Sequence, residues 1–248
     1  MSRPQGRGGG ESRLRWLRLV PALVVGQLGQ SLDGRIATVS GHSHYINGPE
    51  DIVRLHRLRA LADAVVVGAG TVASDDPRLT VRHTTGSNPV RVVLDPGGRL
   101  PSDRAVFRDG AAPTLWLQAG SDGGDRGGPA EHVRIVTIPS TDAGLFRPRE
   151  VLRLLRSRDL GTVLVEGGGR TVSGFLQAGA LDRLHLSVAP LLLGSGRPGI
   201  TLPPVERLDE ALRPRVRHFR LGQDLLFDLD LRAPAEDQPP RDFQALQG

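Results

Sequence analysis

The sequence of 248 residues contains no cysteine and no lysine, so all 32 of its basic residues are arginines. Without cysteine there is no disulfide framework, no thiolate zinc site and no cysteine nucleophile. Without lysine there is no Schiff-base lysine, no pyridoxal-phosphate anchor and no P-loop lysine. These two absences exclude several large classes of enzyme.

Aromatic residues make up only 4% of the chain, which is too few for a platform on which nucleic-acid bases stack. No apolar run approaches the length that a transmembrane helix needs. The apolar segment near the start is interrupted by Arg18 and Pro21, which argues against a signal peptide. We therefore expect a cytoplasmic protein without a membrane partner.

The formal net charge of +5 is concentrated at the amino terminus. Residues 1–18 hold five arginines and one glutamate, which account for four of these charges. We expect residues 1–19 to form a disordered Arg/Gly-rich arm, residues 20–232 a single domain and residues 233–248 a disordered tail. An alternative is that the arm is weakly attracted to nucleic acid or membranes. For the nearly neutral domain we expect no nucleic-acid partner.

The domain is organised around residues 163–172. An apolar, β-branched run predicts a buried strand, Gly167, Gly168 and Gly169 predict a tight turn, and residues 170–178 predict a helix. The free N–H groups that begin such a helix suit a phosphate or diphosphate, and Arg170 and Thr171 add donors on its first turn. The alternative is a tight turn that binds no ligand.

Four further polar residues invite a functional or structural interpretation. Glu166 ends the predicted strand, where α/β proteins place reacting groups, or it satisfies the amides of the glycine turn. Asp33 is expected to hold a turn through side-chain bonds to the backbone. His42 and His44 lie in a polar loop with no third ligand in view, so we expect no metal site.

Short apolar strands alternate with helices along the rest of the domain. Strands are predicted at residues 21–28, 64–68, 89–94, 114–118, 133–138 and 181–189, and helices at 49–62 and 149–158. Residues 216–221 and 225–231 predict a terminal antiparallel pair, and residues 120–129 a surface loop. The pattern predicts a single α/β domain with a mixed, mostly parallel central sheet, helices on both faces and an antiparallel C-terminal edge.

Four stretches taken together resemble one protein family. They are residues 26–37 with the run Ser31-Leu32-Asp33-Gly34, residues 58–65, residues 70–82 and residues 163–169. Their order and spacing are similar to those of the riboflavin-pathway pyrimidine reductases, the reductase half of the bifunctional deaminase–reductase RibD. The run at 71–82 is the specific part, and the resemblance covers residues 21–231.

The resemblance implies a dihydrofolate-reductase-like fold, NADPH as the hydride donor and a homodimer. It also implies reduction of 5-amino-6-(5-phosphoribosylamino)uracil to the ribitylamino form, by hydride transfer to the ribose C1 carbon. A zinc deaminase precedes the reductase in bifunctional relatives, but this sequence has no cysteine with which to build one. We therefore expect a stand-alone reductase.

Site residues follow from the resemblance at matching positions. For a phosphorylated pyrimidine substrate it implies Ser43, Arg59, Leu79, Arg82 and Glu166. For NADPH it implies Gly29, Tyr45, Thr71, Asp75, Gly167, Gly168, Gly169, Arg170 and Thr171. Glu166 and Asp75 are the implied catalytic positions, and no residue is assigned as the proton donor.

Arg59 and Arg82 are the candidates for the substrate phosphate, because a guanidinium fork fits phosphate bidentately. The alternative for either arginine is a solvated surface charge. Two positions depart from the family. Tyr45 stands where tryptophan is usual and Gln27 where lysine is common, which leaves the shape of the cofactor pocket open.

Two other functions compete with pyrimidine reduction. One is an NADPH reductase of the same fold that acts on a pterin, a dihydrofolate-like compound or a secondary metabolite. The other is a non-catalytic nucleotide-binding or regulatory protein whose arginine arm docks on a partner.

Overall fold

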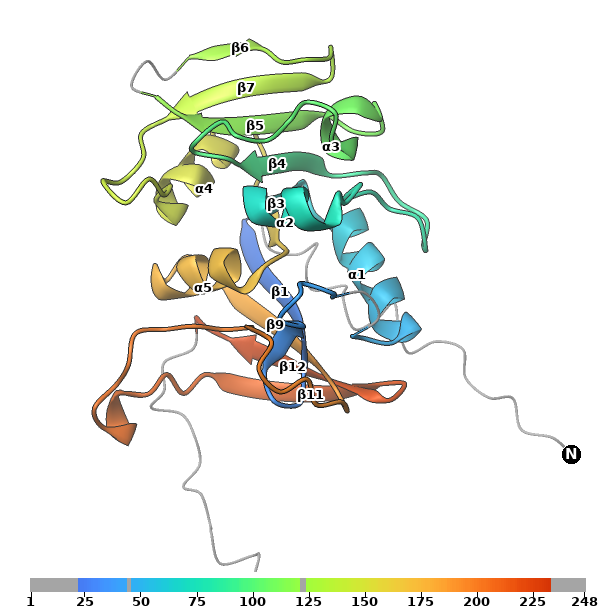
Figure 1. Ribbon diagram of the computed structural model, residues 1–248, viewed down its shortest axis with the longest axis vertical. Helices are drawn as coiled ribbons and strands as arrows, with labels where there is room; N and C mark the ends of the chain where they lie inside the picture. Colours follow the sequence, from blue (N-terminus) through green and yellow to red (C-terminus); the bar gives the residue numbers. More distant parts are fainter. Residues whose placement is uncertain (1–21, 44–45, 121–123, 233–248) are drawn as a thin grey trace, which may run out of the picture.

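The computed structural model describes residues 22–43, 46–120 and 124–232. The expected arm, the expected tail, His44 and Tyr45 lie outside the described residues. A ten-stranded sheet in the order β11-β12-β9-β1-β8-β3-β4-β5-β7-β6 runs through the described part of the chain, from bottom to top in Figure 1. The predicted domain boundaries stay predictions.

The sheet is mixed and mostly parallel. Its strands are β1 (Leu23–Ser31), β3 (Ala64–Gly68), β4 (Val90–Leu94), β5 (Thr114–Ala119), β6 (Asp125–Gly127), β7 (Val133–Ile138), β8 (Thr162–Val165), β9 (Arg183–Ala189), β11 (Arg215–Leu221) and β12 (Asp224–Asp230). From β9 across to β7 neighbouring strands run parallel. The hairpin of β11 and β12 forms the predicted antiparallel C-terminal edge, which is confirmed.

Helices cover both faces of the sheet, as predicted. They are α1 (Pro49–Leu61), α2 (Ala69–Asp75), α3 (Ala105–Arg108), α4 (Pro148–Arg156) and α5 (Gly169–Gln177), with a 3-10 turn η2 at Leu208–Glu210. One apolar core contains side chains of α4 and α5, and a second contains side chains of α1, α2 and α3. Within β3, Val66 faces the first core while Val65 and Val67 face the second. Central strands are therefore apolar on both faces, which explains their continuous valine runs.

The outer half of the sheet, by contrast, buries a polar face beneath α1. Arg183 of β9 donates from Nε to Asp228 Oδ1 of β12 at 2.7 Å. Arg54 of α1 donates to Asp51 Oδ1 at 2.7 Å and lies 3.1 Å from His185 Nδ1 of β9. All five side chains are buried, and such burial is tolerated only because the charges are paired. Polar contacts thus seat α1 on the outer strands.

Several local expectations were wrong. Helices α2 and α3 were not predicted, because they are short and α2 begins at glycine-rich turn signals. Strand β6 occupies part of the predicted loop, and β1 extends beyond residue 28 to Ser31. Gly48 is the N-cap of α1, and the amide of Asn47 before it donates to Asp224 Oδ2 at 3.2 Å. Two short strands, β2 (Arg35–Ala37) and β10 (Arg197–Pro198), form a separate antiparallel pair.

Asp33 has a structural role, as expected, but its backbone bonds reach a distant segment in addition to its own turn. Its carboxylate accepts hydrogen bonds from the Ser31 hydroxyl and from the backbone N–H groups of Leu193 and Gly194. These bonds, that of Ser31 above all, lower the pKa of Asp33 to about 2. Within the described residues, no helix has the length and apolar character to cross a membrane.

Candidate functional site

The turn after β8, at the carboxyl edge of the sheet, is packed so closely that glycine is required. Gly167 has φ +107°, and a Cβ there would lie 2.7 Å from Oγ1 of Thr71 on α2. A Cβ on Gly169 would overlap the carbonyl oxygen of Gly199. The turn is therefore fixed between α2 and the backbone near β10.

Gly168 differs from its two neighbours because space remains beside it. A Cβ at this position would meet only Thr71 Oγ1, at 3.5 Å. The Gly168 N–H donates to the same hydroxyl oxygen at 2.9 Å, whereas the N–H groups of Gly169 and Arg170 have no acceptor among the described residues. Helix α5 thus begins with two unpaired amides at its positive dipole end, which is a suitable place for an anion.

Glu166, at the end of β8, forms a buried two-pronged ion pair with Arg59 of α1. Arg59 donates from Nε to Oε1 at 2.8 Å and from Nη2 to Oε2 at 2.7 Å. The residues are 5% and 6% exposed, respectively. Burial alone would lower the pKa of Arg59, but the charge and hydrogen bonds of Glu166 outweigh it and raise that pKa. Glu166 therefore does not cap the turn amides, and Arg59 is not a solvated surface charge.

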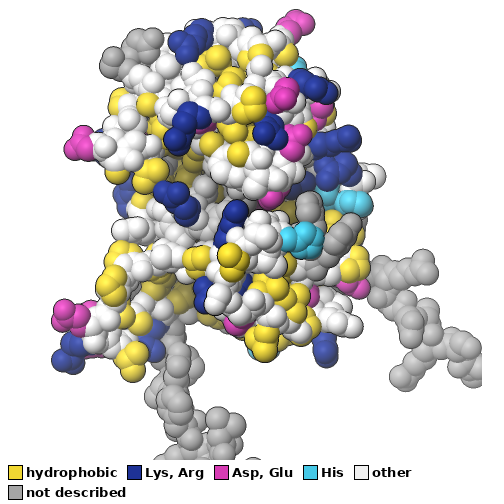
Figure 2. Space-filling model, viewed as in Figure 1, with side chains coloured by type: hydrophobic (Ala, Val, Ile, Leu, Met, Phe, Trp, Pro, Cys, Tyr) yellow, Lys and Arg dark blue, Asp and Glu magenta, His cyan; other side chains and the backbone are white. Residues whose placement is uncertain are grey.

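Residues 76–82 bring a second arginine, Arg82, to the same place. Arg59 Nη1 donates to the Thr80 carbonyl at 3.2 Å, and Arg82 Nη1 donates to Thr80 Oγ1 at 2.8 Å. The pKa of Arg82 is lowered by burial and then by the positive charges of Arg59 and Arg78, while Glu166 opposes the shift. Arg59 pairs directly with the Glu166 carboxylate, whereas Arg82 feels the charges of Arg59, Arg78 and Glu166, and neither Arg78 nor Arg82 has an ion pair among the described residues. Figure 2 shows arginine and histidine side chains gathered on the side of the molecule where α1 lies.

His56 lies beneath this arginine cluster on α1. Its side chain is buried, and Nδ1 accepts a hydrogen bond from the backbone N–H of Arg82 at 3.0 Å. The ring also meets the edge of His83, with centroids 4.6 Å apart. Burial, followed by the charges of Arg59, Arg82 and His83, lowers the pKa of His56 to about 4. The ring is therefore neutral at physiological pH.

We expect the free energy of unfolding to fall as the pH is lowered from about 6.5 towards 4. The folded-state pKa of His56, about 4, lies below the unfolded value of about 6.5, so the unfolded state binds the proton first. Neutral His56 therefore makes its full contribution to the free energy of unfolding above about pH 6.5, and this contribution is lost as the pH falls from about 6.5 to about 4. Urea unfolding at pH 7 and pH 5 measures the difference, which His56→Asn should reduce. The exposed His218→Asn on β11 is the control, and an unchanged slope in His56→Asn contradicts the prediction.

Four other expected site residues have no hydrogen bond or ion pair with Arg59, Arg82 or Glu166 among the described residues. Thr71 Oγ1 contacts the glycine turn, as described, and Gly29 lies on β1 with Asn47 against it. Asp75 is exposed at the end of α2 and has no hydrogen bond or ion pair among the described residues. Leu79 is buried in the second core with φ +56°, so its side chain is not available to a substrate.

The remaining expected positions that the structure describes are partly or fully exposed. Arg170 is exposed on the first turn of α5, and Thr171 beside it packs against Gly68 at the end of β3. Ser43 is half-buried at the edge of a described segment. Tyr45 lies outside the described residues. The structure thus brings Arg59, Arg82 and Glu166 together and does not link Asp75 to them.

Sequence reasoning missed His56, Arg78 and Thr80. His56 precedes Arg59 by three residues on α1, so helical spacing was the available signal that both lie on one side of the helix. Arg78 and Thr80 flank Leu79. Nothing in their local sequence predicted that Thr80 would accept from both Arg59 and Arg82, or that the charge of Arg78 would act on Arg82.

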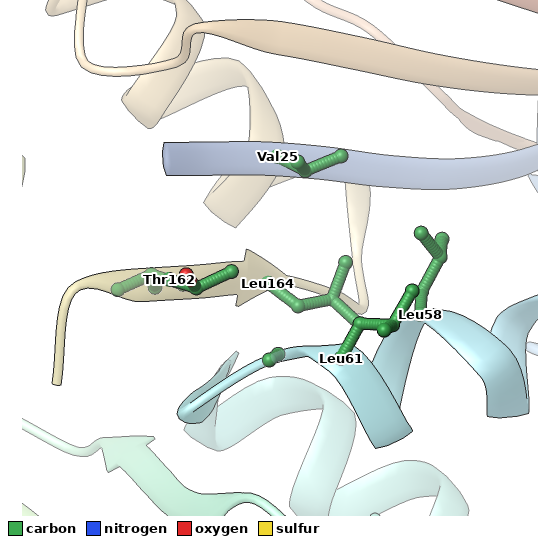
Figure 3. A pocket seen from close by; sticks show the side chains of 7 residues that line it. Val25, Leu58, Leu61, Thr162 and Leu164 are labelled. Atoms are coloured by element: carbon green, nitrogen blue, oxygen red, sulfur yellow. The ribbon is translucent and has the colours of Figure 1, made fainter. Parts of the chain in front are cut away.

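A recess between α1, β1 and β8 lies away from this charged cluster (Figure 3). It is lined by Val25, Leu58, Leu61, Ala62, Thr162, Val163 and Leu164. No charged side chain lines it and most of the lining is aliphatic, so we place no polar ligand there.

Comparison with known proteins identifies the family. Residues 22–227 match the model of the RibD C-terminal domain. The 2,5-diamino-6-ribosylamino-4(3H)-pyrimidinone 5′-phosphate reductase of Methanothermobacter thermautotrophicus is 36% identical over 211 residues, which are 82% of this chain and 94% of that protein. The riboflavin biosynthesis protein RibD of Aquifex aeolicus is 33% identical over 199 residues, which are 79% of this chain and 54% of that protein. The chain therefore spans about half the length of this RibD relative.

Solved structures show the same fold. A deaminase and 5-amino-6-(5-phosphoribosylamino)uracil reductase from Thermotoga maritima superposes with a TM-score of 0.71 at 28% identity, covering 84% of this chain and 56% of that one. A riboflavin biosynthesis reductase from Saccharomyces cerevisiae gives 0.66 at 20% identity, covering 85% and 90%, respectively. The fold is thus the dihydrofolate-reductase-like fold expected from the sequence.

Proposed function

The chain belongs to the RibD C-terminal domain family, and from this premise we propose that it reduces a phosphoribosylamino-pyrimidine with NADPH in riboflavin biosynthesis. A hydride adds to C1 of the open-chain ribosylimine, a proton adds to the imine nitrogen, and the ribosylamino group becomes ribitylamino. The substrate that we propose is 5-amino-6-(5-phosphoribosylamino)uracil. The diamino-pyrimidinone in the name of the Methanothermobacter relative is the close alternative.

The arginine cluster is the observation that carries this proposal. Arg59 pairs with Glu166, and Arg82 lies within the electrostatic influence of Arg59, Arg78 and that carboxylate, so the site holds surplus positive charge that a phosphate dianion would neutralise. Arg59 uses three of its N–H groups within the protein. We therefore propose that Arg82 and Arg78 make most of the hydrogen bonds to the substrate phosphate. Glu166, oriented by Arg59, is proposed to accept hydrogen bonds from the pyrimidine or the ribityl hydroxyls.

We propose that the cofactor diphosphate binds at the start of α5. NADPH, when bound, supplies the hydride. The unpaired amides of Gly169 and Arg170 would donate to its diphosphate, and the exposed Arg170 side chain adds positive charge. Thr71, Thr171, Gly29 and Asp75 stay proposed contacts of the same cofactor. A cytoplasmic location likewise stays a prediction from the sequence.

We expect Arg82→Ala to raise the KM for the phosphorylated substrate and to leave the Kd of NADPH unchanged. Loss of one charged hydrogen bond costs about 1.5–3 kcal/mol, which corresponds to about 10- to 150-fold in KM. Steady-state kinetics of both proteins are measured with the phosphorylated substrate and with the same substrate lacking the 5′-phosphate. The advantage of wild type over Arg82→Ala in KM should disappear when the phosphate is removed. Equal weakening of both ligands would instead assign Arg82 to the fold.

The competing functions are separated by one set of assays. Purified protein is supplied with NADPH and each phosphoribosylamino-pyrimidine, a pterin or dihydrofolate in turn, and NADPH consumption is followed. Turnover with a pterin alone contradicts the proposal. Binding of NADPH without turnover of any substrate favours the non-catalytic alternative.

We also propose that the protein is a homodimer. Residues 192–225 expose large apolar side chains: Leu192, Leu202, Val205, Leu208, Leu212, Val216 and Leu225. Figure 2 shows hydrophobic side chains prominent in the lower part of the molecule, the part in which Figure 1 places β11 and β12. Exposed apolar patches of this kind are typical of interfaces, and a second copy of the chain would cover this one. Sedimentation equilibrium tests the proposal, and a monomer at micromolar concentration contradicts it.

A further inference from the structure

The segment that carries Arg82 has an unusual backbone. Asp76 and Leu79 have φ values of +40° and +56°, which residues other than glycine rarely adopt. Such conformations persist only where the surroundings hold them, and they cluster at functional sites. Here the Leu79 side chain is anchored in the core, and the Val81 N–H donates to Asn88 Oδ1 at 2.8 Å. The arginine at the end of this segment is thus held in a defined place.

Helix α1 holds the same segment from the other side through two residues spaced three apart. Arg59 donates to the Thr80 carbonyl, and His56 Nδ1 accepts from the Arg82 N–H at 3.0 Å. The His56 bond is the one that reaches the backbone of Arg82 itself. Since His56 is only 2% exposed, water does not readily replace this acceptor.

The chemistry at His56 suits an acceptor. A ring nitrogen that accepts a hydrogen bond carries no proton, so the remaining proton of the neutral ring lies on Nε2. Burial first, and then the charges of Arg59, Arg82 and His83, lower the pKa of the ring and so disfavour its protonation. Burial and the positive cluster therefore both keep the Nδ1 lone pair available to the Arg82 N–H.

We propose that His56 is a positioning residue for substrate binding: its Nδ1 fixes the backbone of Arg82 so that the guanidinium meets the substrate phosphate. This inference rests on the proposed function, because it assigns the phosphate to Arg82. A misplacement of about 1 Å in a positioning group is enough to cost up to 100-fold in activity.

Two substitutions separate the acceptor from the ring. His56→Asn keeps an acceptor oxygen near the Nδ1 position but removes the ring, and His56→Phe keeps a ring against His83 but has no acceptor. We expect His56→Phe to raise the KM for the phosphorylated pyrimidine about 10-fold with the Kd of NADPH unchanged. His56→Asn should stay within about 3-fold of wild type. The 10-fold rise is the expected cost of a misplaced Arg82 guanidinium once its backbone loses the acceptor, and the small effect of His56→Asn reflects retention of that acceptor.

A merely structural histidine gives the opposite result, in which the ring matters more than the acceptor. Wild-type KM in a folded His56→Phe, or an equal rise in KM in both variants, overturns the proposal. If His56→Phe does not fold, His56→Asn decides alone: a KM raised 10-fold or more contradicts the acceptor role. Hydrogen exchange of the peptide that contains Arg82 gives a readout without substrate, and His56→Phe should accelerate it.

The Arg82→Ala variant separates two statements: that Arg82 binds the substrate phosphate, and that His56 positions Arg82. One outcome is that Arg82→Ala leaves KM unchanged while His56→Phe accelerates hydrogen exchange. The proposed function then assigns the phosphate to the wrong residue, and His56 still positions the segment that carries Arg82. If Arg82→Ala raises KM and His56→Phe changes neither KM nor exchange, the proposed function stands and the role of His56 is refuted.

Discussion

Replacing Glu166 with alanine should lower the free energy of unfolding by about 3–5 kcal/mol and abolish reductase activity. The reason is the partner that remains. Arg59 is 6% exposed and directs two donors at the Glu166 carboxylate, so its charge would be left buried without an anion. Urea unfolding measures the loss of stability, and NADPH consumption measures the loss of activity. A variant as stable as wild type would contradict the buried ion pair.

A double variant separates folding from function at this pair. Arg59→Met combined with Glu166→Leu removes both charges, and such apolar replacements of a buried pair are often neutral or stabilising. Because the Thr80 carbonyl also loses its donor, we expect recovery of at least about half of the stability lost in Glu166→Ala. Activity should stay absent. Activity in the double variant would show that the pair is structural and does not contact the substrate.

Gly168→Val should raise the Kd of NADPH about 10- to 150-fold while the protein stays folded. The valine methyl groups would occupy the space beside the two unpaired amides, and losing one charged hydrogen bond to the diphosphate costs about 1.5–3 kcal/mol. No protein atom obstructs the new Cβ, since Thr71 Oγ1 is 3.5 Å away and the backbone at Gly168 is extended. Loss of a good capping residue should cost only about 1 kcal/mol of stability. Titration of NADPH by calorimetry measures the Kd.

Two neighbouring glycines provide the controls for this experiment. Gly174 lies inside α5 with no atom near its added Cβ, so Gly174→Ala should stabilise the protein by about 0.5–1 kcal/mol and leave the Kd unchanged. Gly169→Ala forces a Cβ into the Gly199 carbonyl and should prevent the native turn from forming. If Gly168→Val binds NADPH as wild type does, the diphosphate does not lie at the start of α5.

The central strands and the glycine turn were predictable because their signals are local. The run from Ala64 to Gly68 is apolar at every position before the glycine, as expected for a strand buried on both faces. Gly167 and Gly169 marked a turn whose tightness is visible in the contacts that a Cβ would make. Helix α2 was missed for the same kind of reason, because Gly68 and Gly70 flank Ala69 and give a turn signal where a short helix begins.

The polar contacts were not predictable in this way. Glu166 and Arg59 were each singled out, but as separate ligand contacts, and their sequence separation of 107 hides their pairing. Leu79 was expected at the substrate, and its positive φ turns the side chain into the core instead. His56 gave no local signal of an acceptor role, because the N–H that it accepts belongs to a segment 26 residues away.

The sequence by itself determined the α/β class, the glycine turn before α5 and the family, because hydrophobic period, glycine placement and motif order are all properties of neighbouring residues. Only the tertiary structure decided which charges meet. Arg59 reaches Glu166 because α1 packs against the sheet beside β8, and Arg82 reaches His56 because a strained segment folds back over α1. The partner of a buried charge depends on how distant segments pack, and that information is not written in any one stretch of the chain.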